Sequence, residues 1–266
     1  MELIFATIFG LLVGSFLNVA IYRLHPDRRE KMSIIDPPRS LCTTCNRQLS
    51  SWENIPLISW LWLRGKSYCC KEPISIQYPT VELISAAAAA GSVIRFGATP
   101  TAVVVYFLIA SLIVISFIDL ASKIIPNVIS YPGIIAGLML GIISEYFHIF
   151  NFPITSGAMD SLIGAFLGSG FLYLVSWGYY LYSKKIGLGG GDIKLLAMTG
   201  AILGWQSALP TIVLGSMSGA VIGIFLMVFA KKGRHAEIPF GPWLSLGAIL
   251  YIFQVPGLSL LFPPLQ

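Results

Sequence analysis

The sequence predicts an all-α polytopic membrane protein, with about eight transmembrane helices and one small cytoplasmic loop domain that contains cysteines. Hydrophobic residues make up 56% of the chain and charged residues only 11%, and the mean hydropathy is +0.79. Soluble domains carry about a quarter charged residues. Several segments of roughly 18 residues or more also carry almost no charge, which is the length that crosses about 30 Å of hydrocarbon.

The apolar runs define the expected spans. The first run has no Lys or Arg at its start, unlike a signal peptide, and basic residues follow it from Arg23 onward, so we expect an uncleaved helix. The sixth run is short and follows three glycines, so we expect it to tilt or to be partly buried in protein. The spans are residues 2–22, 79–96, 101–119, 128–147, 158–182, 193–207, 209–230 and 240–262. Three domains follow: the first helix (1–22), a cytoplasmic loop domain (23–78) and the remaining membrane domain (79–266).

The basic residues predict the orientation. With the N-terminus outside, 16 of the 17 Lys and Arg residues fall in or beside cytoplasmic segments, and only Arg95 lies outside. Cytoplasmic loops of membrane proteins carry this excess of positive charge. The net charge of +5 therefore reflects topology, and we expect membrane lipid but no nucleic acid among the partners.

Two aspartates are candidate catalytic residues. The chain has five Asp residues; two belong to the loop and Asp160 falls at the outer face, whereas Asp119 and Asp192 each lie at the cytoplasmic end of a span. Two close carboxylates share a proton, because both cannot ionise cheaply. The ionised one can activate a water while the other protonates a leaving amine. Peptide hydrolysis by such a pair needs no metal or cofactor.

Position alone leaves other interpretations open. Asp192 would make a good helix N-cap after three glycines, and Asp119 could pair with Lys123 one helical turn later. The two carboxylates could also form the proton relay of a transporter. Against a transporter, the chain shows no internal repeat, and the carboxylates lie at span ends and not near the midplane.

The four cysteines occur in the first cytoplasmic loop. Cys42 and Cys45 form a Cys-x-x-Cys pair, and Cys69 and Cys70 follow about 25 positions later. In a reducing compartment, such a cluster is more typical of a metal site than of disulfides. The alternative is a reduced, metal-free loop packed on the membrane domain.

Several motifs together resemble a known family. Residues 189–192 fit the pattern Gly-x-Gly-Asp, and the segment after Asp119 continues to Ile125-Pro126-Asn127. Other matching stretches occur in family order and cover most of the chain: residues 14–19, 54–57, 63–66, 73–75 and 78–82. The sequence therefore resembles the type IV prepilin peptidases, which are intramembrane aspartyl proteases of bacteria.

The resemblance implies a bifunctional enzyme of the bacterial inner (cytoplasmic) membrane. Such an enzyme cleaves the leader of prepilins and pseudopilins after a Gly, and then methylates the new N-terminal residue with S-adenosylmethionine. Asp119 and Asp192 match the catalytic dyad. Gly65 and Lys66 match a loop associated with methyl transfer, although a plain turn with a solvated Lys would give the same pattern.

The cysteines depart from the family pattern, in which two Cys-x-x-Cys pairs form a tetrathiolate zinc site. Aligned on the neighbouring motifs, the third ligand falls on Ser67, while Cys70 takes the fourth position. Cys69 could substitute, or it could be a bystander that points away. The expected ligand set for a structural zinc is thus Cys42, Cys45, Cys69 and Cys70, and a peptidase that has lost methyl transfer remains an alternative function.

Overall fold

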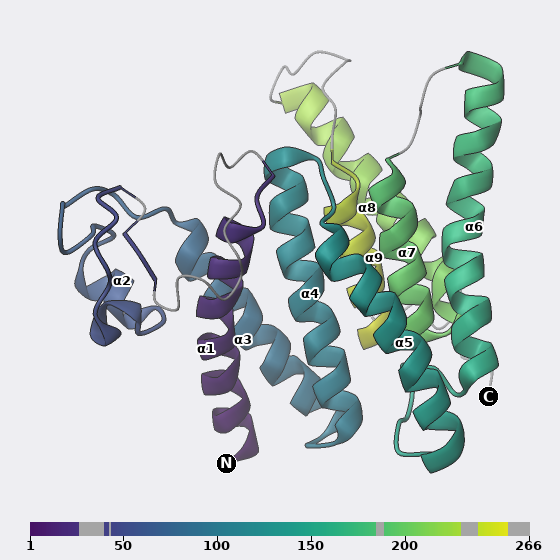
Figure 1. Cartoon of the computed structure of the whole chain (residues 1–266), viewed down its shortest axis with the longest axis horizontal. Coiled ribbons are helices and arrows are strands. Elements are labelled where there is room, and N and C mark those ends of the chain that lie inside the picture. The colour runs from purple at the N-terminus through teal and green to yellow at the C-terminus, as the bar shows by residue number, and fades with distance from the viewer. Residues whose placement is uncertain (27–39, 43, 185–188, 230–238, 255–266) are drawn as a thin grey trace. The chain divides into compact units, whose positions relative to one another are not determined.

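A computed structural model describes residues 1–26, 40–42, 44–184, 189–229 and 239–254 (Figure 1). Across these ranges the regular structure is helical, apart from two isolated β-bridges in the cysteine-containing loop. The predicted all-α class is therefore confirmed. The helices are α1 (Glu2–Arg23), α2 (Ile58–Trp62), α3 (Gln77–Phe96), α4 (Pro100–Ser122), α5 (Asn127–Phe147), α6 (Ala158–Ser183), α7 (Gly190–Leu203), α8 (Ala208–Phe229) and α9 (Gly241–Phe253), with 3₁₀ turns at Ser51–Asn54 and Trp205–Ser207.

Each expected span overlaps a helix in its described residues, and five helical segments are long and apolar enough to cross a membrane. These are α1, α4, α5, α6 and the segment Trp205–Phe225, which includes most of α8. Among the others, α7 has 14 residues and α9 has 13 in its described part. The chain is thus a multi-pass membrane protein, and the total of eight spans stays a prediction. Residue 230 and residues 255–262 of two expected spans lie outside the described residues.

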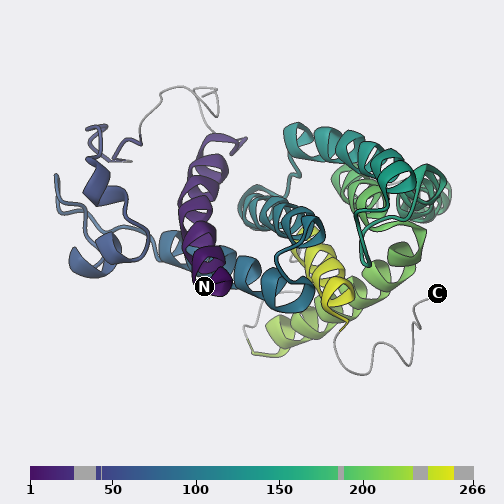
Figure 2. The same ribbon diagram turned by 90° about the horizontal axis from the view of Figure 1, so that it is seen from below.

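Packing divides the chain into two compact units, Met1–Val114 and Ile115–Gln266, with the boundary inside α4. In the first unit α1 packs along α3 (Figures 1 and 2). A Cβ atom on Gly10 would lie 2.7 Å from the Cα of Ala86, so the two backbones are in direct contact, as small residues allow in membranes. The buried Ser85 hydroxyl donates to the carbonyl of Gly10 at 2.7 Å and lies 2.9 Å from the Tyr106 hydroxyl. This polar contact joins α1, α3 and the first half of α4.

In the second unit, α7 is enclosed by neighbouring helices and packs most extensively on α6 and α5. Every residue from Leu195 to Leu203 is buried, which confirms the expectation that this short run is partly buried in protein. Glycines make the close approach possible: a Cβ on Gly164 of α6 would collide with the carbonyl oxygen of Gly200 of α7. The middle and the end of α7 are thereby held against α6.

We expect Gly164→Ala to destabilise the second unit, because the added methyl has no room against Gly200. Overpacking of this kind costs about 1–3 kcal/mol, so the thermal unfolding midpoint of the purified protein in detergent should fall. The control is Gly170→Ala in the same helix, where an added Cβ meets nothing within 4 Å. Equal midpoints for the two variants would contradict the tight crossing.

Candidate functional site

Asp119 lies in the last turn of α4 with its side chain buried; the residue is only 4% exposed. One carboxylate oxygen, Oδ2, accepts a hydrogen bond of 2.9 Å from the backbone amide of Gly241. Gly241 is the first residue of α9, so this amide is one of the helix N-terminal donors that lack a partner within the helix. The contact holds the carboxylate of α4 at the beginning of α9.

Asp192 lies in the first turn of α7, as its third residue. The helix begins at Gly190 and its N-cap is Gly189, so the interpretation of Asp192 as the N-cap is wrong. Chain folding instead places the Asp192 carboxylate near Gly189, where a Cβ would lie 3.3 Å from Oδ2. A carboxylate in this turn is favoured by the helix dipole and, unlike Asp119, is only partly buried.

Asp119 and Asp192 lie on segments that approach each other at one shared apolar residue. Ile125, in the connection from α4 to α5, packs between their supporting segments and is buried. A Cβ on Gly191 would lie 2.9 Å from the Cβ of Ile125, and a Cβ on Gly241 would lie 3.2 Å from its Cδ1. The fold therefore brings Asp119 and Asp192 together within the second unit, from sites 73 positions apart, although their catalytic role remains a prediction.

A polar bridge joins the beginnings of α5 and α7 beside this pair. The ammonium group of Lys194 donates to the side-chain oxygen of Asn127 at 2.8 Å, and it lies 5.2 Å from the centre of the Tyr131 ring. Asn127 follows Pro126, which is the N-cap of α5. The bridge thus fixes the register of the two helices whose first turns flank the aspartates.

Sequence reasoning missed two residues of this site. Gly241 was noticed only as part of the last apolar run, although the Gly-Pro dipeptide at positions 241–242 is a signal for a helix beginning. Ile125 entered only through a family motif. Their importance is spatial, because both contact the segments that carry the aspartates.

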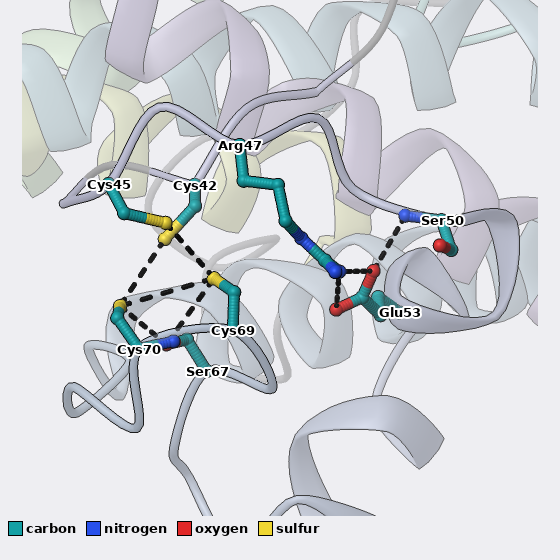
Figure 3. A network of polar contacts seen from close by, with 8 residues as sticks. All are labelled: Cys42, Cys45, Arg47, Ser50, Glu53, Ser67, Cys69 and Cys70. Carbon is teal, nitrogen blue, oxygen red and sulfur yellow. Dashed lines mark hydrogen bonds and ion pairs between the residues drawn. The ribbon is translucent and has the colours of Figure 1, made fainter.

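The four cysteine thiols form a second cluster, in the first unit (Figure 3). Their sulfur atoms all lie within 4.8 Å of one another, and none of the four forms a disulfide. The distance is 3.8 Å from Cys42 to Cys70, 3.2 Å from Cys45 to Cys69 and 4.0 Å from Cys69 to Cys70. Cys69 therefore points into the cluster and is not a bystander.

The cluster has the donor set that a structural zinc ion requires. Tetrahedral coordination at Zn–S distances near 2.3 Å separates the sulfur atoms by about 3.8 Å, close to the separations in this loop. Burial raises the pKa of Cys42, but hydrogen bonds from the backbone amides of Cys45 and Thr44 outweigh it and lower the pKa to about 6. Metal binding needs deprotonated thiols, and the pKa of the neighbouring Cys45 is instead raised to about 11. The fit to zinc therefore rests on the four clustered thiols.

Ser67, at the expected third-ligand position, contacts the cluster from its edge. Its hydroxyl lies 3.0 Å from the sulfur of Cys70 and accepts a hydrogen bond of 3.4 Å from the Cys70 amide. A hydroxyl beside a thiolate can donate to it and so orient the ligand. Cys69 supplies the thiol that the family pattern would place at Ser67.

An ion pair supports the same loop. The Arg47 guanidinium contacts both carboxylate oxygens of Glu53, at 2.8 and 2.7 Å, and Glu53 also accepts from the Ser50 amide at 2.7 Å (Figure 3). Glu53 is buried, and a buried carboxylate is tolerated when it is paired in this way. Together with the thiol cluster, this contact supplies the cross-links that a small domain with little apolar core needs for stability.

Gly65 and Lys66 lie on a tight turn after α2. Gly65 has φ +69°, a conformation that glycine adopts readily, and a Cβ there would lie 3.1 Å from the Trp60 ring. The carbonyl of Gly65 accepts from the Ile74 amide at 2.7 Å, and Lys66 is exposed. The turn explains the glycine structurally, and a role of either residue in cofactor binding stays a prediction.

The fold and these sites define a helical membrane protein with two carboxylates at helix ends and a four-thiol cluster in a loop. Family models match in the same arrangement: the bacterial peptidase A24 N-terminal domain at residues 8–96 and the type IV leader peptidase family at residues 106–224. No solved structure matches the chain significantly.

Curated relatives cover nearly the whole chain. A prepilin leader peptidase/N-methyltransferase of Pseudomonas putida is 37% identical over 91% of this chain and 86% of its own length. Proteins of the same name from Stutzerimonas stutzeri (37% identical, 97% and 93% covered) and Pseudomonas aeruginosa (35%, 95% and 91%) are similar. The chain belongs to the type IV prepilin leader peptidase/N-methyltransferase family, a family of enzymes.

We expect Gly241→Ala to impair prepilin cleavage strongly without unfolding the protein. The new Cβ would lie 2.7 Å from Oδ2 of Asp119, so the carboxylate must move, and a displacement of about 1 Å in an active site can cost about 10²-fold in rate. Cleavage of a prepilin in proteoliposomes measures the effect. The matched control is Gly178→Ala, where an added Cβ meets nothing within 4 Å; similar rates for both variants would refute a supporting role for the Gly241 contact.

We expect Cys69→Ser to reduce the zinc content of the purified protein and to weaken the thiolate-to-metal absorption of its cobalt-substituted form, because one of four ligands is lost. Adding Ser67→Cys to this variant should restore both signals, since position 67 already contacts Cys70 and the exchange recreates a Cys-x-x-Cys pair. Unchanged metal content and spectrum in Cys69→Ser alone would show that Cys69 is not a ligand.

Proposed function

We propose that this protein cleaves the leader of prepilins or pseudopilins after a Gly and methylates the new N-terminal residue. The observation that carries the proposal is that the fold brings Asp119 and Asp192 to one place in a chain of this family: Gly241, which binds Asp119, and Gly191, next to Asp192, both pack on Ile125. Peptidases of the aspartic type need two carboxylates that share a proton, and the fold supplies two from separate helices.

In the proposed mechanism the two aspartates act as a pair. One ionised carboxylate activates a water for attack on the scissile carbonyl, while the protonated partner polarises that carbonyl and later gives its proton to the leaving amine. The amide of Gly241 holds Asp119 in place, and the partly exposed Asp192 is positioned by the first turn of α7. Apparent pKa values belong to the pair and not to either residue.

We also propose that the site faces the cytoplasm in a bacterial inner membrane, with the N-terminus outside and about eight spans. The distribution of basic residues supports this orientation. A prepilin has a basic cytoplasmic leader followed by an apolar helix, so its cleavage junction meets the membrane at that face. Gly190, two residues before Asp192, leaves room there, because a Cβ at this position would meet nothing within 4 Å.

The loop domain is proposed to serve methyl transfer. S-adenosylmethionine would supply the methyl group, and the turn at Gly65 and Lys66 is the proposed place of its contact. Zinc held by the four cysteines would fix the fold of the loop, and proteolysis needs no metal. Because Cys69 points into the thiol cluster, Ser67 gives little reason to expect that the methylating activity has been lost.

We expect Asp119→Asn and Asp192→Asn each to abolish cleavage of a co-expressed prepilin, because an amide can neither share the proton nor activate water. Both variants should still methylate a synthetic peptide that begins with the mature N-terminal residue, and this retained activity serves as the folding control. Mass spectrometry of the substrates measures both steps. Cleavage by either variant would reject the dyad. An unmethylated product from the wild type would show that the protein is a peptidase without methyltransferase activity.

A further inference from the structure

The short helix α2 in the loop domain carries an exposed apolar strip, formed by Ile58, Leu61 and Trp62. These side chains are 60%, 66% and 80% exposed, and their spacing of three and four residues places them on one face of the helix. Ile55, one turn earlier, is also exposed. Such a strip on a small domain indicates an interaction surface.

The opposite side of α2 is packed and therefore fixes the direction of the strip. The indole nitrogen of Trp60 donates to the carbonyl of Ile74 at 3.3 Å, and its ring lies against Gly65. Thus α2 is amphipathic, with one side anchored to its own domain and the other uncovered by the described residues of its unit.

Contacts within the first unit determine the depth of α2. The amide of Leu57, the N-cap of α2, donates to the carboxylate of Glu82 in α3 at 2.8 Å. Glu82 in turn lies beside α1, where a Cβ on Gly14 would be 2.7 Å from its Cα. Gly14 precedes Arg23, the end of α1, by nine residues, or about 14 Å at 1.5 Å per residue.

The beginning of α2 is therefore level with the interior of a helix that crosses the membrane, and not beyond its end. The side chain of Glu82 together with its 2.8 Å hydrogen bond spans roughly 8 Å, which is less than the roughly 14 Å to the end of α1. Figure 1 shows the same relation, with α2 beside the upper half of α1. An exposed apolar strip at this depth meets lipid before it meets water.

The residues around the strip are those of a membrane interface. Trp is enriched at the boundary between headgroups and acyl chains, and the exposed Arg64 and Lys66 follow Trp62 closely. Basic side chains beside an apolar face are attracted to the anionic lipids of the cytoplasmic leaflet. Ile76, the exposed residue just before α3, extends the apolar surface toward the membrane helix.

We propose that α2 is a lipid-docking element: Ile58, Leu61 and Trp62 insert at the boundary of acyl chains and headgroups in the cytoplasmic leaflet, with Arg64 toward the phosphates. The bilayer covers the strip and seats the cysteine-containing loop against the membrane. The inference rests on contacts within the first unit and is independent of the proposed catalytic dyad.

Photo-crosslinking of the full chain tests the proposal. A benzophenone amino acid at position 62, in vesicles of phosphatidylethanolamine and phosphatidylglycerol, should give lipid adducts by mass spectrometry in several-fold higher yield than the same group at position 68. Tyr68 is exposed but packs by its ring edge on Trp52 and beneath Lys71. Crosslinks from position 62 to the protein itself or to an added prepilin, without lipid adducts, would overturn it.

A second measurement avoids the bulky label. In the same lipids brominated near the headgroup, Trp62→Phe should remove a larger share of the quenched tryptophan fluorescence than Trp52→Phe, because Trp62 is expected to contact lipid. Equal loss from the two variants would show that position 62 is not at the lipid boundary.

Discussion

The candidate active site depends on one constraint: a carboxylate buried at the end of a membrane helix needs a fixed partner. Asp119 is satisfied by the first amide of α9, and this contact requires the α9 backbone to approach closely. Only glycine permits that approach, since a side chain at position 241 would occupy the space of the carboxylate. Burying a charged group without a partner is costly. The burial of Asp119 therefore requires a glycine at position 241, which is 122 positions away in the sequence.

The placement of Asp192 follows from backbone packing of a different kind. The glycine contacts between α6 and α7 allow a helix of only 14 residues to be enclosed by its neighbours from Leu195 to Leu203, while its polar N-terminal turn stays partly exposed. Non-helical backbone is tolerated at a membrane only where protein or water surrounds it. The glycines before Asp192 meet this condition, with Gly191 packed on Ile125, and they bring a second carboxylate beside the first.

The loop domain is held by contacts at two levels. Within the loop, the thiol cluster and the Arg47–Glu53 pair replace the apolar core that so short a segment cannot build. At its boundary, Glu82 of α3 accepts the amide of Leu57, and this bond ties the loop to a helix packed on α1. The two proposals for the loop, methyl transfer and the lipid contact of α2, thus rest on the same small set of polar contacts.

The sequence by itself determined the all-α class and the places of the long apolar helices, and it pointed to the two aspartates, because apolar length and intramembrane charge are local properties of a chain. It also identified the four cysteines, but left Cys69 open, since the direction of adjacent side chains depends on the turn that carries them. The N-cap assignment of Asp192 was wrong because three glycines offer several places for a helix to begin. Only the tertiary structure decided that Gly241 and Ile125 support the carboxylates and that α2 lies level with α1, because these facts arise from packing between segments that no local pattern connects.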